Sequence, residues 1–71
     1  MCKILIISDS TSLNKRISKV LEKKHYTINT TTTAIEGLDV IESKKPNLIM
    51  LEILMPDMSG FELISKISSI D

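Results

Sequence analysis

A single carboxylate stands where sheet proteins commonly bind ligands. Glu52 directly follows the run LIML, residues 48–51, in which apolar side chains occupy consecutive positions. Consecutive apolar residues point to both faces of a strand, so the run predicts a strand covered on both sides, as central strands of parallel sheets are. Ligands of open α/β sheets bind in the crevice at the carboxyl ends of the strands. The pattern therefore places the candidate site at Glu52.

A second carboxylate, Asp9, follows the other strongly apolar run, Lys3–Ile7. It lies within the polar cluster SDSTS at residues 8–12. Ser, Thr and Asp side chains cap helix N-termini by accepting hydrogen bonds from free backbone N–H groups. The cluster favours a helix N-terminal or capping role for Asp9 over a role as a metal ligand, and it predicts a helix directly after the first strand.

The remaining reactive side chains favour structural roles. His25 follows two lysines at an expected helix end, where positive charge stabilises the helix dipole. Met50, Met55 and Met58 suit an aliphatic core, and Cys2 has no partner motif. The sequence contains no nucleophile–base pair, glycine-rich phosphate loop or His/Cys metal cluster, so we predict no enzymatic activity.

The elements that would position the two carboxylates alternate between strands and helices. The strand Lys3–Ile7 precedes an amphipathic helix, and residues 26–30 predict a weaker, more polar strand that suits a sheet edge. Thr33 and Glu36 fit a capping box at the start of a second helix, which Pro46 must end. Each of these two helices has an apolar face that we expect to pack on the sheet. In the first helix it consists of Leu13, Ile17, Val20 and Leu21, and in the second of Ala34, Leu38 and Ile41.

A third helix follows the strand 48–51. Ser59 and Glu62 repeat the capping-box spacing, and an apolar stripe continues from there to the last residues: Leu63, Ile64, Ile67 and Ile70. The order is therefore β-α-β-α-β-α within one domain, residues 1–71. Such alternation predicts an α/β fold with a parallel sheet and right-handed crossovers.

Composition narrows the class of protein. Nine basic and nine acidic residues cancel, so the basic footprint of a nucleic-acid-binding protein is missing. No apolar run approaches the ~18 residues of a membrane span, and we expect no membrane partner. The lone Cys2 cannot form an internal disulfide. We therefore expect a soluble protein in a reducing compartment, the cytoplasm.

Four segments, taken in order, resemble the receiver domain of two-component response regulators. They are the first strand with Asp9, the segment Lys45–Leu48 (KPNL), the segment Glu52–Pro56 (EILMP) and the segment Ser59–Leu63 (SGFEL). The resemblance covers the whole chain and corresponds to the first half or more of such a domain. It implies half of a flavodoxin-like, CheY-like doubly wound parallel sheet with strand order 2-1-3.

The resemblance also implies a chemistry. In this family an Asp at the end of the third strand accepts a phosphoryl group from a kinase histidine. It uses a divalent ion, which that Asp holds with an acidic pair and a backbone carbonyl. Here Glu52 stands at the acceptor position, Ser8 and Asp9 replace the acidic pair, and Leu54 would supply the carbonyl. Two carboxylates, Asp9 and Glu52, could hold Mg²⁺ weakly, because hard divalent ions prefer oxygen ligands.

Two departures argue against phosphorylation. Glu52 is one methylene longer than Asp, and phosphoryl transfer tolerates little displacement of the reacting atoms. The sequence also ends before the family's fourth and fifth strands, which carry a Ser or Thr and a Lys. Glu52 could imitate a phosphorylated Asp through its fixed charge, or it could simply have lost the acceptor function.

We therefore predict a truncated receiver that cannot be phosphorylated and acts as an interaction or dimerisation module in signalling. A homodimer is expected through the third strand, because an apolar strand left at a sheet edge tends to pair. A histidine kinase or another signalling protein is the other candidate partner. The alternative is a residual phosphorelay receiver, a kinase decoy or phosphate sink. The predicted interface residues are Leu48, Ile49, Met50 and Leu51.

Overall fold

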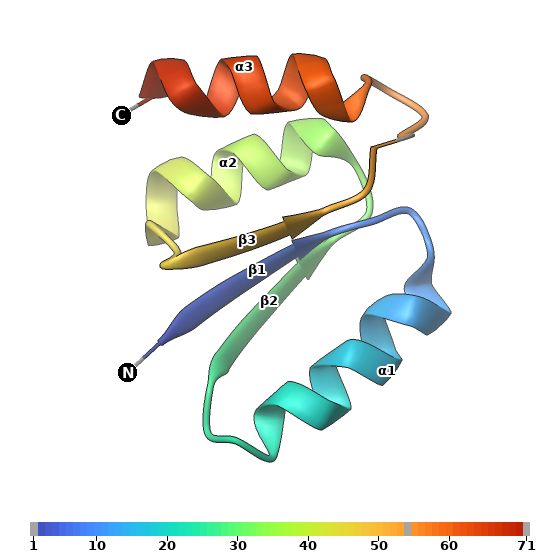
Figure 1. The fold of residues 1–71 in the computed structure, drawn as a ribbon, viewed down its shortest axis with the longest axis vertical. Coiled ribbons are helices and arrows are strands. Elements are labelled where there is room, and N and C mark those ends of the chain that lie inside the picture. The colour runs from blue at the N-terminus through green and yellow to red at the C-terminus, as the bar shows by residue number, and fades with distance from the viewer. Residues whose placement is uncertain (1, 54, 71) are drawn as a thin grey trace.

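The computed structural model describes residues 2–53 and 55–70 and contains three strands and three helices that alternate along the chain (Figure 1). Their bounds are β1 Lys3–Ile7, α1 Thr11–Glu22, β2 Thr27–Thr31, α2 Ala34–Lys44, β3 Leu48–Leu51 and α3 Gly60–Ile70. The predicted order of elements is confirmed.

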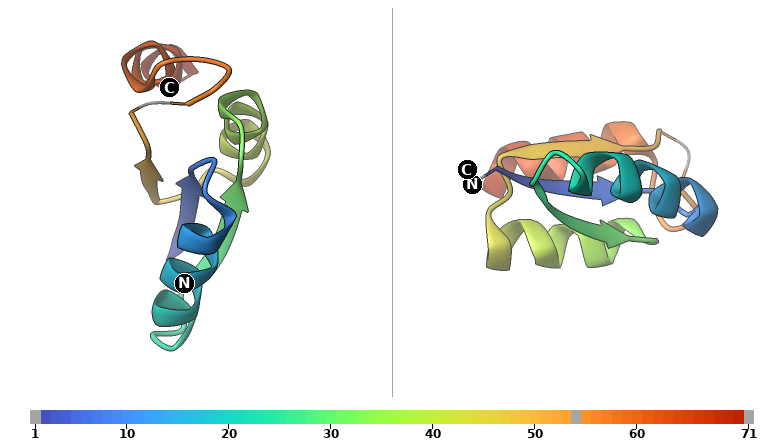
Figure 2. Two further views of the ribbon diagram at one scale, coloured as in Figure 1. Left: turned by 90° about the vertical axis from the view of Figure 1, so that its right-hand side faces the viewer. Right: turned by 90° about the horizontal axis from the view of Figure 1, so that it is seen from below.

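The strands form one parallel sheet in the order β2-β1-β3, as predicted. Ile4 of β1 lies opposite Ile28 of β2 on one side and opposite Leu48 of β3 on the other. Helix α1 covers one face of the sheet, while α2 and α3 lie side by side on the other (Figures 1 and 2). This arrangement is the predicted half of a doubly wound sheet, with the polar strand β2 at an edge.

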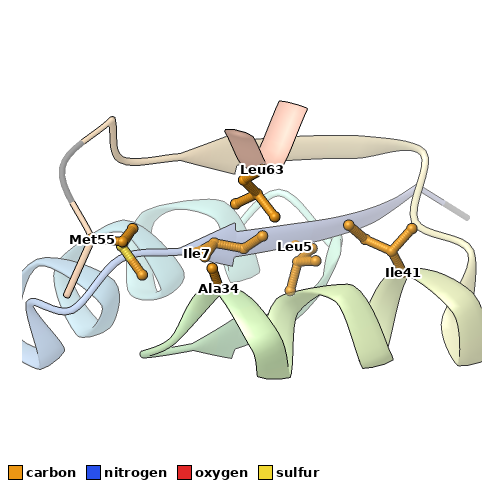
Figure 3. Packing of buried hydrophobic residues seen from close by; sticks show 6 residues of the cluster. All are labelled: Leu5, Ile7, Ala34, Ile41, Met55 and Leu63. Atoms are coloured by element: carbon orange, nitrogen blue, oxygen red, sulfur yellow. The ribbon is translucent and has the colours of Figure 1, made fainter. Parts of the chain in front are cut away.

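The core lies between the sheet and the pair α2 and α3 (Figure 3). Leu5 and Ile7 of β1 are fully buried there, because alternate residues of a strand face the same side. Ile4 and Ile6 face α1 and are also buried. The other members of the core cluster come from the helices and the loop before α3: Ala34, Ile41, Met55 and Leu63.

Helix starts follow the predicted chemistry with two corrections. Ser10 rather than Asp9 caps α1, because its hydroxyl accepts a hydrogen bond from the Leu13 N–H at 3.2 Å. Thr33 caps α2 by accepting from the Glu36 N–H, as predicted. The Glu36 carboxylate, however, accepts from the Thr33 hydroxyl at 3.1 Å instead of from the cap N–H.

The second strand differs in its bounds from the expectation, and residues in the left-handed conformation follow the first two helices. The second strand begins one residue later than predicted, at Thr27. His25 lies in the exposed turn after α1, where it has a left-handed φ of 66° and its N–H donates to the Glu22 carbonyl. Lys45 has the left-handed conformation at the end of α2, directly before Pro46.

The expectation of a strand buried on both faces is wrong for β3. Ile49 and Leu51 are half-buried on the side of α2 and α3, but Leu48 is 50% exposed and Met50 is 39% exposed. Met50 is therefore not a core filler, whereas Met55 is buried and Met58 packs against the core. The reason is positional: β3 lies at the edge of the sheet, where α1 leaves the Leu48 and Met50 side uncovered.

Two predicted apolar stripes are likewise only partly buried. In α1 the buried residue is Asn14, while Leu13 and Val20 are exposed. In α3 Leu63 is buried and Ile67 packs against the core, but Ile64 and Ile70 are exposed. Both helices therefore carry apolar side chains that are not buried against the sheet and remain exposed.

Candidate functional site

The candidate site lies where β1 and β3 end side by side. The Glu52 N–H donates to the Ile7 carbonyl at 3.0 Å, which continues the ladder between these strands by one residue. The Ser8 N–H donates to the Thr31 carbonyl at 3.1 Å and links the same end of β1 to β2. Residues 8 and 52 therefore occupy neighbouring positions at the carboxyl end of the sheet, as predicted from their strands.

A hydrogen bond joins these two residues. The Ser8 hydroxyl donates to Oε2 of Glu52 at 2.7 Å, a short distance of the kind expected when the acceptor is a carboxylate. The same Ser8 oxygen accepts from the Ser10 N–H at 3.2 Å, and Ser8 is only 3% exposed. Ser8 thus fixes the Glu52 side chain relative to the start of α1.

Asp9 does not join this contact. Its side chain is exposed, one residue before the Ser10 cap, and it forms no hydrogen bond or ion pair with the rest of the described chain. Within residues 2–53 and 55–70, no group of three or more His, Cys, Asp or Glu side chains could hold a metal ion. The carbonyl of Leu54, the third expected ligand, lies outside the described residues.

This donor set does not fit a tightly held divalent ion. Such an ion takes six or more oxygen ligands and usually needs one or two carboxylates free to bind it. One Glu52 oxygen already accepts a hydrogen bond from the Ser8 hydroxyl, and this hydroxyl stands where a second acid is expected. Where the family's acid pair would help to hold the ion, Ser8 instead donates a hydrogen bond to Glu52.

The loop after Glu52 is attached to α2 by a residue that the sequence did not reveal. Asp57 accepts hydrogen bonds from the Ala34 N–H and the Ile35 N–H, each at 3.0 Å, one on each carboxylate oxygen. These two N–H groups lower the pKa of Asp57 below its ordinary value of 3.8, because they favour the charged form. The only sequence signal at Asp57 is its position directly after Pro56, which indicates a turn but not a contact with α2.

The start of α3 lies tightly against the same loop. The Gly60 N–H donates to the Ile53 carbonyl, and a Cβ at Gly60 would lie 2.6 Å from the Ile53 Cα. Only glycine permits this approach. The Ile53–Gly60 contact thus joins the two ends of this loop, and Asp57, between them in sequence, attaches the loop to the start of α2.

One known protein family matches almost the whole chain. The family model described as the response regulator receiver domain matches residues 4–71. The chain belongs to the receiver domain family. Receiver domains act in two-component signal transduction, where they interact with histidine kinases and other signalling proteins. None of the helices described here has both the length and the apolar character that crossing a bilayer requires.

Similar proteins come from several signalling systems. Sporulation initiation phosphotransferase F of Bacillus subtilis is 28% identical over 69 residues, which cover 97% of this chain and 56% of that protein. The putative transcription regulator BvgA of Bordetella pertussis is 35% identical over 69 residues, which cover 96% of this chain and 33% of that protein.

Solved receiver structures superpose on the whole fold. A two-component response regulator from Clostridium difficile has a TM-score of 0.96 at 32% identity, with 100% of this chain and 59% of that chain covered. A CheY-like receiver from Methanospirillum hungatei has a TM-score of 0.95 at 36% identity, with 99% and 56% covered. This chain therefore spans little more than half the length of these receivers.

Proposed function

We propose that this receiver-family chain is a protein-binding module of two-component signalling that does not carry a phosphoryl group. The observation that carries the proposal is the 2.7 Å hydrogen bond from Ser8 to Glu52. It holds the side chain at the acceptor position against the end of β1. The Ser8 hydroxyl also stands where a carboxylate would be needed to hold a metal ion.

The chemistry of phosphoryl transfer supports this proposal. Transfer depends on metal ions that neutralise developing charge and on precise in-line placement of the acceptor. Glu52 extends one methylene beyond Asp, and its Oε2 already accepts a hydrogen bond from the Ser8 hydroxyl. We therefore expect no stable phosphoryl adduct, and only weak divalent-ion binding at Asp9 and Glu52.

The open edge of β3 supports the binding role. In the described sheet β3 pairs only with β1, so the other edge of Leu48–Leu51 leaves backbone N–H and C=O groups free for another chain. Addition of a strand to such an edge is a common mode of protein recognition. The proposed interface is Leu48, Ile49, Met50 and Leu51, and its proposed occupant is a second copy or another signalling protein.

Intact-mass measurement after incubation with acetyl phosphate and Mg²⁺ tests the phosphorylation claim. We expect no mass gain, and the same result for Glu52→Gln. A stoichiometric gain that Glu52→Gln abolishes would contradict the proposal and favour a residual phosphorelay receiver. The double variant Ser8→Asp, Glu52→Asp provides a matched control, because it restores the family's carboxylates on the same backbone.

Light scattering tests the interface claim separately. A homodimer through β3 predicts twice the chain mass at micromolar concentration. A folded monomer under these conditions would contradict the homodimer while leaving the intact-mass result unchanged.

A further inference from the structure

The outer edge of β2 presents backbone groups to another chain. β2 is an edge strand of the sheet and pairs with β1 on one side (Figure 1). The Thr31 carbonyl accepts from the Ser8 N–H, so Thr31 points its backbone groups toward β1. The backbone groups of successive strand residues point to opposite sides. Those of Ile28 and Thr30 therefore point away from β1.

This edge lacks the usual protection against strand pairing. Residues 27–31 read TINTT, without a charged side chain or a proline that would keep another strand away. In CheY-like sheets, whose strand order is 2-1-3-4-5, the second strand is also an edge strand. The edge is therefore open as a property of the fold, whatever the length of the chain.

Two lysines flank the edge on the face of α1. Lys15 and Lys19 line a hollow between α1 and β2, together with Thr30 of the edge and one acid, Glu22. Both lysine side chains are exposed, and neither forms an ion pair with the rest of the described chain. One helical turn separates them, about 6 Å along α1. This spacing is close to the ~6.6 Å between alternate side chains of a strand.

Two acids flank the same edge on the other face. Glu36 and Asp39 of α2 line a hollow with residues 30–32, and among the described residues no basic side chain lines it. Both acids are exposed. The Thr32 hydroxyl donates to Oε1 of Glu36 at 3.5 Å, which places this carboxylate at the end of the edge strand. The edge thus has positive side chains on one face and negative side chains on the other.

We infer that the β2 edge binds an extended segment of a partner protein in which acidic and basic residues alternate. A strand added to a sheet edge is held by main-chain hydrogen bonds and selected through its alternate side chains. Successive side chains of a strand point to opposite faces. Alternation would therefore place every acid on the face of the two lysines and every base on the face of the two carboxylates. This inference rests on the proposed role as a binding module but concerns a different edge from β3.

A second copy of this chain does not complement the edge. Two β2 edges would pair antiparallel about a two-fold axis perpendicular to the sheet, which keeps α1 on the same face in both copies. Lysines would then lie beside lysines and carboxylates beside carboxylates, and such like-charge contacts are unfavourable. The charge pattern therefore selects a different chain as the occupant.

The test is a titration with two peptides of about eight residues, too short to be helical in isolation. Both contain equal numbers of glutamates and lysines, which alternate in one peptide and follow each other in pairs (EEKK) in the other. The paired order puts both charges on each face. Fluorescence anisotropy should show about five- to tenfold tighter binding of the alternating peptide. In ¹⁵N-HSQC spectra of the full chain, the outward amides of Ile28 and Thr30 should shift more than that of Asn29.

Methylation of the peptide backbone tests the strand geometry without changing the protein. An N-methyl group removes a backbone donor and blocks pairing on its side of the strand. In the alternating peptide all glutamate N–H groups point to one side and all lysine N–H groups to the other. Of two peptides methylated at every glutamate or at every lysine, one should lose binding and the other should keep it. Loss in both, or in neither, would overturn the inference.

Charge reversal on α1 tests which face receives the acids. Lys15→Glu should weaken binding of the alternating peptide about three- to fivefold. Lys66→Glu, at an exposed position of α3, is its matched control and should leave binding unchanged. A peptide in which lysine alternates with threonine should bind more tightly to Lys15→Glu than to the parent chain, a gain that unfolding cannot produce.

Other results would also overturn the inference. These are equal binding of the alternating and paired peptides, equal effects of Lys15→Glu and Lys66→Glu, or shifts confined to β3. Shifts at Ile28 and Thr30 that depend on protein concentration without peptide would identify a second copy as the occupant and overturn it as well. A mass gain with acetyl phosphate would contradict the proposed function without affecting any of these binding readouts.

Discussion

The two faces of the sheet differ in how completely helices cover β3. On one face α2 and α3 lie together over Ile49 and Leu51, and the buried core lies beneath them. On the other face α1 covers β1 but leaves Leu48 and Met50 exposed. The strand is apolar on both sides, so its composition does not decide its burial. The number of helices on each face does.

The largest loss of stability is expected when the Leu63 side chain is removed from the covered face. Leu63 is fully buried in the core cluster, so Leu63→Ala should lower the free energy of unfolding by about 2–5 kcal/mol. Ile64→Ala, on the exposed side of the same helix, should cost about 1 kcal/mol or less. Urea unfolding followed by circular dichroism measures both. Equal costs would show that the outer side of α3 is also covered.

Substitutions at two neighbouring residues of β3 allow a direct comparison of the two faces. Ile49→Asp places a carboxylate on the covered face and should cost about 2–3 kcal/mol. Met50→Asp places it on the open face and should cost about 1 kcal/mol or less. Urea unfolding at two protein concentrations is the measurement. A large, concentration-dependent cost for Met50→Asp would show that a second copy covers the open face in solution.

Gly37 marks the closest approach of α2 to the covered face. A Cβ at this position would lie 2.5 Å from Cδ1 of Ile7, which is fully buried, so the Ile7 side chain would have to shift within the packed core. Alanine is the better helix former by about 1 kcal/mol, but the clash should outweigh it. We expect Gly37→Ala to destabilise the fold by about 1–2 kcal/mol. Ser43→Ala, on the exposed side of α2, should be neutral or slightly stabilising, and thermal unfolding of both variants measures the difference.

The smallest effect is expected at Asp57, which ties the loop before α3 to α2. Its folded pKa lies below its ordinary value of 3.8, so its contribution to stability is present above that pH and is lost as the pH falls through the folded pKa. Asp57→Asn should therefore be less stable than the parent chain at neutral pH, and the difference should shrink below about pH 4. Thermal unfolding from pH 7 to pH 2 checks this. A constant difference would exclude the carboxylate charge as its cause.

Local chemistry made much of the fold predictable. Thr33 and Pro46 mark the limits of α2 through capping and a missing N–H, and both act within a few residues of sequence. The polar strand β2 lies at an edge, as its composition indicates. The position of Glu52 at the end of β3 follows from the apolar run before it.

What could not be predicted depends on contacts between distant residues. Asp57 caps a helix that begins 23 residues earlier, and no local pattern connects the two segments. The Ser8 hydroxyl finds Glu52 because two strand ends meet across 44 residues. Asn14 is buried in α1 because its amide donates to the Ser8 carbonyl at 3.0 Å, although helical periodicity assigns burial to the neighbouring Leu13.

The central position of β1 has a consequence for the order of events during synthesis. β1 is made first, yet one of its two neighbours in the sheet, β3, follows 44 residues later. At a translation rate of about 5–20 residues per second, that interval lasts about 2–9 s. Until β2 has been made, β1 has no strand to pair with, and from then until β3 is made it can pair only with β2. The nascent chain is thus exposed to aggregation or chaperone capture for seconds, until the ribosome releases β3.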